Sequence, residues 1–189
     1  MPNQRITHKE TPPELDDRLI CAAMNGDADA LAAIYDAYMR RLYCYFYSRI
    51  ENAVEAEDLT AQTFMAVIEA LPRYQHRGQF TAWIFQIARN KVMDYYRRDY
   101  PAALVDASCP DHFCEEPLEK VIQDQTVEML RLHIQQFDEA DRELLRLRFA
   151  AKCSYVEIAD LLGRKEDAVR KSVNRLLDQL YARMEASHA

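Results

Sequence analysis

Hydrophobic residues recur at helical spacing over most of the chain. After Asp27, which can cap a helix, they fall at i, i+3, i+4 and i+7, at Leu31, Ile34, Tyr35, Tyr38, Leu42, Tyr45 and Phe46. The same period predicts a shorter helix that ends at Gly26, and further helices at about residues 55–71, 81–98, 118–136 and 139–150. No run of alternating β-branched residues bounded by turns is present, so the chain is predicted to be all-α.

A helix-turn-helix pattern lies near the C-terminus. Ser154 and Glu157 have the spacing of a capping box, in which each side chain bonds the backbone N–H of the other residue, so a helix is predicted to start there. Gly163 can take the left-handed conformation that ends a helix. The apolar period then resumes in a second helix, at Val169, Val173, Leu176 and Leu177. This arrangement is typical of DNA-binding proteins, although similar helical hairpins without that function are common.

The segment at residues 101–117 breaks the apolar period with prolines, acids and small residues, which indicates an interdomain linker. It divides the chain into two small helical domains, at residues 15–100 and 118–186. Residues 1–14 contain several prolines and are predicted to be a disordered arm. The predicted architecture is therefore two helical domains joined by a flexible acidic linker.

Charge is distributed unevenly along the chain, whose formal net charge is -7. Residues 73–98 hold six basic groups against Asp94, and the second helix of the helix-turn-helix is also basic, whereas residues 101–125 hold six acids against Lys120. Two basic regions on an acidic chain favour contact with nucleic-acid phosphates, and the acidic tether is not expected to lie along DNA. A solvated face on an ordinary basic helix is the alternative.

The first basic region also carries aromatic and amide groups. Residues 73–79 read Arg-Tyr-Gln-His-Arg-Gly-Gln, and the helix after them bears Asn90 and more cations. This mixture is typical of sites that hold splayed single-stranded bases, while Trp83 is expected to lie in the core. The preceding helix, at about residues 55–71, is apolar on more than one side, so it needs two packing partners, and the second can be another protein.

The five cysteines form no CxxC pair and their number is odd, which argues against a disulfide framework and fits a reducing compartment. Cys109, His112 and Cys114 lie close together, but no fourth soft ligand is nearby, so neither a metal site nor a cofactor is predicted; metal or redox sensing there stays open. No apolar run approaches the ~18 residues of a membrane span. The polar N-terminus also lacks an apolar signal segment, so the protein is expected to be cytoplasmic, with no membrane insertion.

Three motifs follow one another in the chain. The first runs from Ala56 to Phe64, the second from Phe80 to Arg98, and the third is the helix-turn-helix with a lead-in from Arg142 to Phe149. With these motifs in this order, the chain resembles the extracytoplasmic-function (ECF, group IV) sigma factors of the sigma-70 family over nearly all of its length. The second motif is the most specific of the three.

The resemblance implies a transcription initiation factor that is not an enzyme and that binds core RNA polymerase and promoter DNA. It implies docking on the clamp helices of the largest polymerase subunit and on the flap, with an anti-sigma factor as a further partner. Polymerase docking is expected by this resemblance at Asp58, Leu59, Gln62, Thr63 and Phe64. The minus-ten strand is expected at Tyr74, His76, Arg77, Asn90, Lys91, Asp94, Arg97 and Arg98. The minus-thirty-five groove is expected at Arg164, Lys165, Arg170, Lys171, Ser172, Asn174 and Arg175.

Some residues depart from the family pattern. Ala61 and Gln62 stand where a Gln-Glu pair is usual, which removes one acidic contact to polymerase. In the recognition helix the departures are Lys165 for a Ser or Thr cap, Asp167-Ala168 for Gly-Thr and Lys171-Ser172 for Ser-Arg. The promoter sequence therefore does not follow from the resemblance.

Two other classes of protein remain as alternatives. One is a regulator that binds duplex DNA through its C-terminal half alone, and tight binding to a palindrome without polymerase would identify it. The other is a nucleic-acid enzyme with a helix-turn-helix module, such as a recombinase. No constellation of Ser, Tyr or clustered carboxylates with supporting basic residues favours the enzyme.

Overall fold

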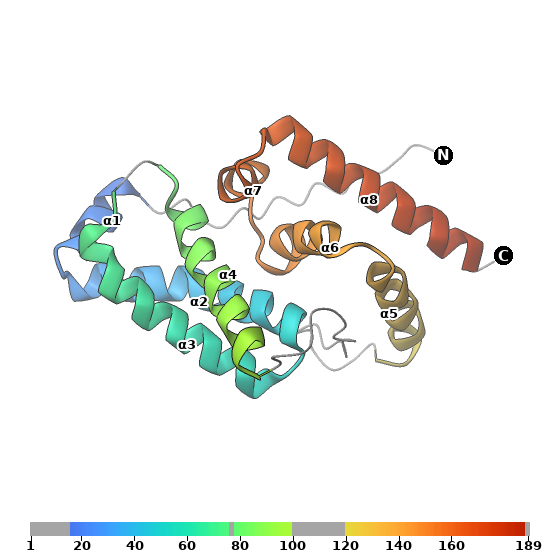
Figure 1. Cartoon of the computed structure of the whole chain (residues 1–189), viewed down its shortest axis with the longest axis horizontal. Coiled ribbons are helices and arrows are strands. Elements are labelled where there is room, and N and C mark those ends of the chain that lie inside the picture. Colours follow the sequence, from blue (N-terminus) through green and yellow to red (C-terminus); the bar gives the residue numbers. More distant parts are fainter. Residues whose placement is uncertain (1–15, 76–77, 100–119, 188–189) are drawn as a thin grey trace.

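The structure is a computed structural model that describes residues 16–75, 78–99 and 120–187. Within these residues every regular element is helical, which confirms the predicted all-α class. Figure 1 shows two groups of helices, α1 to α4 in one and α5 to α8 in the other. The predicted arm at residues 1–14 and the predicted linker at residues 101–117 lie outside the described residues.

The N-terminal group contains α1 (Asp17–Met24), α2 (Ala28–Ile50), α3 (Ala53–Ala70) and α4 (Phe80–Asp99). Asp27 caps α2, as predicted, because its carboxylate accepts a hydrogen bond from the Ala30 backbone N–H at 2.9 Å. A short 3-10 turn, η1 (Leu71–Arg73), follows α3 and contains Pro72, which cannot continue an α-helix. Long α2 packs against both α1 and α3, and α4 lies across α3 (Figure 1).

The C-terminal group contains α5 (Lys120–Gln135), α6 (Glu139–Leu145), α7 (Tyr155–Leu162) and α8 (Glu166–Ser187). A π-helical turn, η2 (Arg146–Ala150), extends α6, so the helix predicted at residues 139–150 consists of two parts. Helix α8 packs against α5, α6 and α7. None of the helices among the described residues is long and apolar enough to cross a membrane.

The predicted apolar stripe of α2 faces the core, with Leu42, Tyr45 and Phe46 completely buried. Tyr35 is an exception, because 48% of its surface is exposed. It follows Ile34 by one residue and so points about 100° away around the helix, where its ring packs against Phe64 at 4.7 Å between centroids. Trp83 is half-buried rather than fully within the core.

The two groups of helices pack directly against each other. Helix α2 contacts η2, and α4 contacts α7. Two charged residues are buried there, Arg41 of α2 and Glu143 of α6. Buried charged groups are stable only when they are paired and hydrogen-bonded, so these residues need partners at the boundary between the two halves.

Candidate nucleic-acid interface

The helix-turn-helix forms as the sequence predicts. The Glu157 backbone N–H donates to the Ser154 hydroxyl at 3.2 Å, and the Ser154 backbone N–H donates to the Glu157 carboxylate at 2.6 Å, which completes the capping box. Gly163 ends α7 in the left-handed conformation, with φ of 62°. These two local features set the direction in which α8 leaves the turn.

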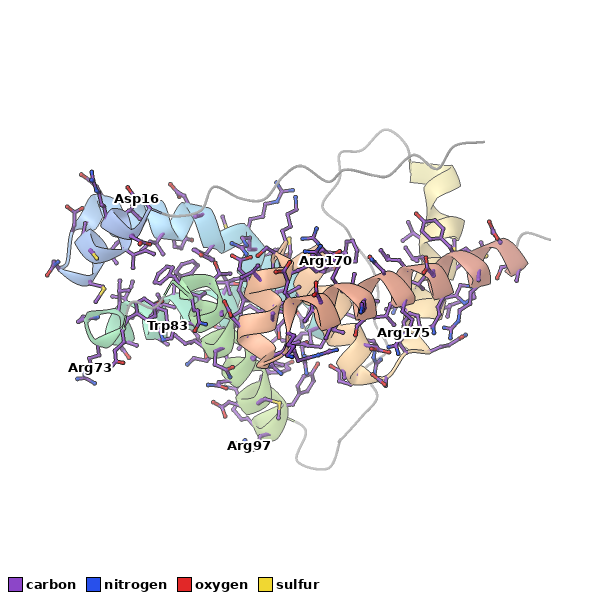
Figure 2. All side chains as sticks on the ribbon, turned by 90° about the horizontal axis from the view of Figure 1, so that it is seen from above. Asp16, Arg73, Trp83, Arg97, Arg170 and Arg175 are labelled. Carbon is purple, nitrogen blue, oxygen red and sulfur yellow. The ribbon has the colours of Figure 1, made fainter. Side chains whose placement is uncertain are left out.

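Helix α8 has one buried face and one exposed basic face. Val169, Val173 and Leu176 are completely buried against the rest of the C-terminal half. On the opposite side a shallow surface depression is lined by Lys171, Asn174, Arg175, Asp178, Gln179 and Ala182. Of the residues predicted for groove contact, Ser172 is half-buried and the other six are exposed. Figure 2 shows Arg170 and Arg175 along this helix.

The arginines near the turn already have partners within the chain. Arg164 donates to the Ser172 hydroxyl at 2.9 Å, and Arg170 pairs with Glu166 one turn earlier in α8. Arg175 reaches the Asp141 carboxylate of α6 at 3.1 Å. Because Arg170 and Arg175 are exposed, pairs of this kind contribute only about 0–1 kcal/mol each. Phosphate oxygens can therefore replace these partners at little cost.

A second polar surface lies at the C-terminal end of α4. Asn90, Asp94, Arg97 and Arg98 are exposed there, and Lys91 is half-buried. Arg97 donates to Asp94 at 3.3 Å. The spacing of three to four residues places Asn90, Asp94 and Arg97 along one side of the helix, which suits a strand that follows its axis.

The aromatic group lies at the other end of α4. Tyr74 packs against Trp83 and Phe80, with ring centroids 4.6 and 5.3 Å apart, and it is half-buried. Trp83 and Arg97 are separated by fourteen residues, which is about 21 Å along a helix. Figure 2 shows these two residues well apart on α4. The structure therefore does not bring the aromatic group beside the cations at the end of α4, and His76 and Arg77 lie outside the described residues.

The predicted docking residues of α3 divide between two faces. Leu59, Thr63 and Phe64 are buried within the N-terminal half, at 4%, 0% and 6% exposure, and cannot touch a partner in this conformation. They are buried because α3 packs against both α2 and α4, which use its most apolar side. Contact of these three residues with polymerase stays a prediction.

The outward face of α3 carries the rest of the predicted docking set. Asp58 is exposed and accepts a hydrogen bond from half-buried Gln62 at 2.6 Å. Two apolar residues that the prediction missed continue this face, Met65 at 62% and Ile68 at 49% exposure. Met65 follows Gln62 by three residues and Ile68 follows Met65 by three, and this helical spacing is the signal that could have identified them.

The cysteines in the described part of the chain form no disulfide: Cys21 is exposed, Cys44 is half-buried and Cys153 is buried. Burial raises the pKa of the Cys153 thiol to about 12, so the thiol is neutral near physiological pH. Cys109, His112 and Cys114 lie outside the described residues.

Known proteins share both the sequence pattern and the fold. The family model of sigma-70 region 2 matches residues 34–100, from within α2 to the end of α4. The ECF RNA polymerase sigma factor BldN of Streptomyces coelicolor is 28% identical over 159 residues, which cover 80% of this chain but only 59% of BldN. The ECF RNA polymerase sigma factor SigD of Mycobacterium tuberculosis is 28% identical over 176 residues, which cover 87% of this chain and 81% of SigD. The solved structure of CnrH, in complex with the cytosolic domain of CnrY, covers 89% of this chain and 96% of its own with a TM-score of 0.65 and 22% identity, and shows the same fold.

The region 2 match and these relatives make the chain similar to the ECF RNA polymerase sigma factors of the sigma-70 family. The resemblance predicted from the three sequence motifs is thereby confirmed.

Proposed function

We propose that the protein is a sigma factor that binds core RNA polymerase and directs transcription initiation at promoters with minus-ten and minus-thirty-five elements. The observation that carries this proposal is the pair of separate, exposed basic surfaces on one chain of this family, at the end of α4 and on α8. Residues 15–100 would act as region 2 and residues 118–186 as region 4, joined by the linker at residues 101–117. The role is that of a binding factor, not an enzyme.

The α4 surface is proposed to hold the minus-ten strand. Asn90 and Asp94 can form hydrogen bonds with base edges, while Lys91, Arg97 and Arg98 neutralise phosphates. The half-buried ring of Tyr74, with His76 and Arg77 beside it in the sequence, would contact the strand separately at the other end of α4.

The α8 surface is proposed to enter the major groove at the minus-thirty-five element. The exposed cations Arg164, Lys165, Arg170, Lys171 and Arg175 suit phosphate oxygens or guanine edges. Asn174 lies among them in the surface depression and can read a base edge, and the hydroxyl of Ser172 adds a further polar group.

The outward face of α3 is proposed to dock on the clamp helices of the largest polymerase subunit. This face is formed by Asp58, Gln62, Met65 and Ile68. Gln62 stands where the family pattern has an acidic residue, so apolar contact through Met65 and Ile68 would replace that acidic contact. Further partners proposed for the protein are the polymerase flap, for the C-terminal half, and an anti-sigma factor. The protein itself, as a sigma factor, would act in the cytoplasm, where RNA polymerase works.

Run-off transcription tests this function directly. Purified core RNA polymerase is supplied with pooled upstream genomic fragments, with and without the chain, and transcripts that start only with the chain are expected. A folded chain that yields no such transcript, yet binds a palindrome without polymerase, would favour the stand-alone regulator.

The α4 assignment is tested by Arg97→Ala combined with Arg98→Ala. This variant is expected to weaken promoter binding by the polymerase complex and to reduce its salt dependence by about 0.7–0.9 in slope for each lost phosphate contact. Arg18→Ala combined with Arg40→Ala is the matched control, because both arginines are exposed and lie in α1 and α2, away from α4. An unchanged salt slope in the first variant would remove α4 from the phosphate contacts.

A further inference from the structure

Arg175 of α8 is held by a carboxylate from another helix. Its Nη2 donates to both oxygens of Asp141 in α6, at 3.2 Å to Oδ1 and 3.1 Å to Oδ2. The two residues are 34 positions apart in the sequence, and Figure 2 shows the place of Arg175 on α8. The pair therefore depends on the packing of α6 against α8 within the C-terminal half of the chain.

The Asp141 carboxylate has a firm support. The residue belongs to the first turn of α6, and its backbone N–H donates at 2.8 Å to the carboxylate of Asp138, which caps the helix. Only 21% of the Asp141 side chain is exposed, against 58% of the Arg175 side chain. A short, half-buried side chain on a capped helix has little freedom to swing away. Asp141 therefore restricts the direction in which the guanidinium of Arg175 points.

The ion pair of Arg170 and Glu166 is of a different kind. Both residues belong to α8, and they lie one helical turn apart. Pairs at this spacing are common on exposed helix surfaces and contribute little, because both side chains follow the same helix and can separate into solvent. Asp141 instead connects Arg175 of α8 to a neighbouring helix. Contact from a second helix is what fixes the orientation of an exposed side chain.

The carboxylate beside Arg175 determines which DNA groups the arginine suits. Both contacts with Asp141 use Nη2, and a guanidinium carries five N–H donors in a planar fork, so further donors are available to DNA. A phosphate bound to these donors would lie close to the negative charge of Asp141 and would be repelled. A guanine edge carries no charge and offers O6 and N7 in the major groove, which match the fork. The pair therefore favours a base over a phosphate.

We propose that Asp141 is a positioning residue for DNA recognition, which holds Arg175 so that its guanidinium reads a guanine edge in the minus-thirty-five element. This inference rests on the proposed sigma function and deepens it, because it assigns base reading to one cation of the α8 surface. Arg175 lines the same surface depression as Lys171 and Asn174, so this base contact lies beside a cation and an amide that also suit DNA. Asp141 itself contacts no DNA in this role.

Two variants remove the support from α6. Asp141→Ala removes the carboxylate, and Asp141→Asn removes the charge but keeps the shape and one acceptor oxygen. Both keep the backbone N–H that donates to the cap of α6. Arg175→Ala removes the reading group, and its combination with Asp141→Ala completes a double-mutant cycle. Asp178→Asn is the matched control, because it removes the same charge from an exposed residue of the same depression.

The templates are promoters recovered in the run-off experiment, with each base pair of the minus-thirty-five element replaced in turn. Competition between altered and original templates for the complete polymerase complex gives the discrimination at each position. Circular dichroism and thermal unfolding establish that each variant is folded.

The wild type is expected to discriminate by about 5- to 150-fold at one G·C pair. Arg175→Ala should abolish discrimination there and keep the salt slope, because it removes no phosphate contact. Asp141→Ala should lower discrimination at that position alone, by about 2- to 5-fold, and Asp141→Asn should lower it by a smaller factor. The double variant should match Arg175→Ala, and Asp178→Asn should keep the wild-type discrimination.

Unchanged discrimination in Arg175→Ala, or in Asp141→Ala, would overturn this inference alone. An equal loss at every position in Asp141→Ala would also overturn it, because a purely structural role predicts that result. Losses that add in the double variant would do the same, since Asp141 would then act without Arg175. If Asp141→Ala does not fold, the discrimination of Asp141→Asn decides. Absence of transcript from the wild type would overturn the proposed sigma function, and this inference with it.

Discussion

The outward face of α3 allows docking to be tested separately from folding. Met65 on this face is 62% exposed, whereas Leu59 on the inward face is 4% exposed. Complete burial of a methionine side chain is worth about 1.5–3 kcal/mol. Because 62% of Met65 is still exposed, its burial against polymerase would contribute roughly 1–2 kcal/mol to binding.

Met65→Ala is therefore expected to weaken binding to core polymerase by about 5- to 30-fold. Its free energy of unfolding should change by no more than about 0.5 kcal/mol, since the side chain is on the surface. Leu59→Ala should instead lower the free energy of unfolding by about 2–5 kcal/mol through the cavity it leaves. Any loss of binding in Leu59→Ala would follow from unfolding, so this position does not report on docking.

The assay is a fluorescence anisotropy titration of labelled chain with core polymerase, with thermal unfolding measured on the same samples. Leu132→Ala is the matched control, because this residue of α5 is 50% exposed and lies in the other half of the chain. Met65→Asp is a stronger test, because it would bury an unpaired charge in the contact. If both variants are folded and bind core polymerase as tightly as the wild type, docking through this face is refuted.

Three further predictions concern the cap of α7, the basic face of α8 and the reactivity of two cysteines. Ser154→Ala removes the acceptor for the Glu157 backbone N–H and is expected to lower the free energy of unfolding by about 1 kcal/mol. An unchanged thermal unfolding curve would contradict this expectation. Lys171→Ala is expected to lower the salt slope of minus-thirty-five binding by about 0.9, because it removes a phosphate contact. Asn174→Ala should keep this slope and alter the base preference. The reverse result would assign the phosphate contact to Asn174 and the base contact to Lys171. Because the raised pKa keeps the buried Cys153 thiol neutral, maleimide near neutral pH should label Cys21 rapidly and Cys153 very slowly in the folded chain, as measured by mass spectrometry of digests.

The helices and the helix-turn-helix could be predicted because their signals are local. Asp27, Ser154 and Gly163 act within one turn of their own position, so the predicted helix ends agree with the structure. The inward face of α3 could not be predicted in the same way, since Leu59 and Ile68 make the helix apolar on more than one side. Periodicity shows which residues share a face, but not which face meets the core.

The packing between the two halves also escaped prediction. A charged residue in an amphipathic helix is ordinarily placed on the solvent side, and by that rule Arg41 and Glu143 belong outside. Their partners are distant in the sequence: Tyr45 and Glu143 are 98 positions apart, and Arg41 and Ala151 are 110 apart. Only the three-dimensional packing of α2 against α6 and η2 provides these pairs.

The contacts of Glu143 have a consequence for how this protein and its descendants can change by mutation. Its single carboxylate accepts a hydrogen bond from Tyr45 and pairs with Arg49 and Arg89. Loss of Glu143 would leave two half-buried cations without their shared partner, and loss of either cation would leave the buried acid without one of its counter-charges. Substitutions at these positions are therefore expected to be inherited together. Lineages that keep the acid should keep its donors, and lineages that replace it should replace several donors as well.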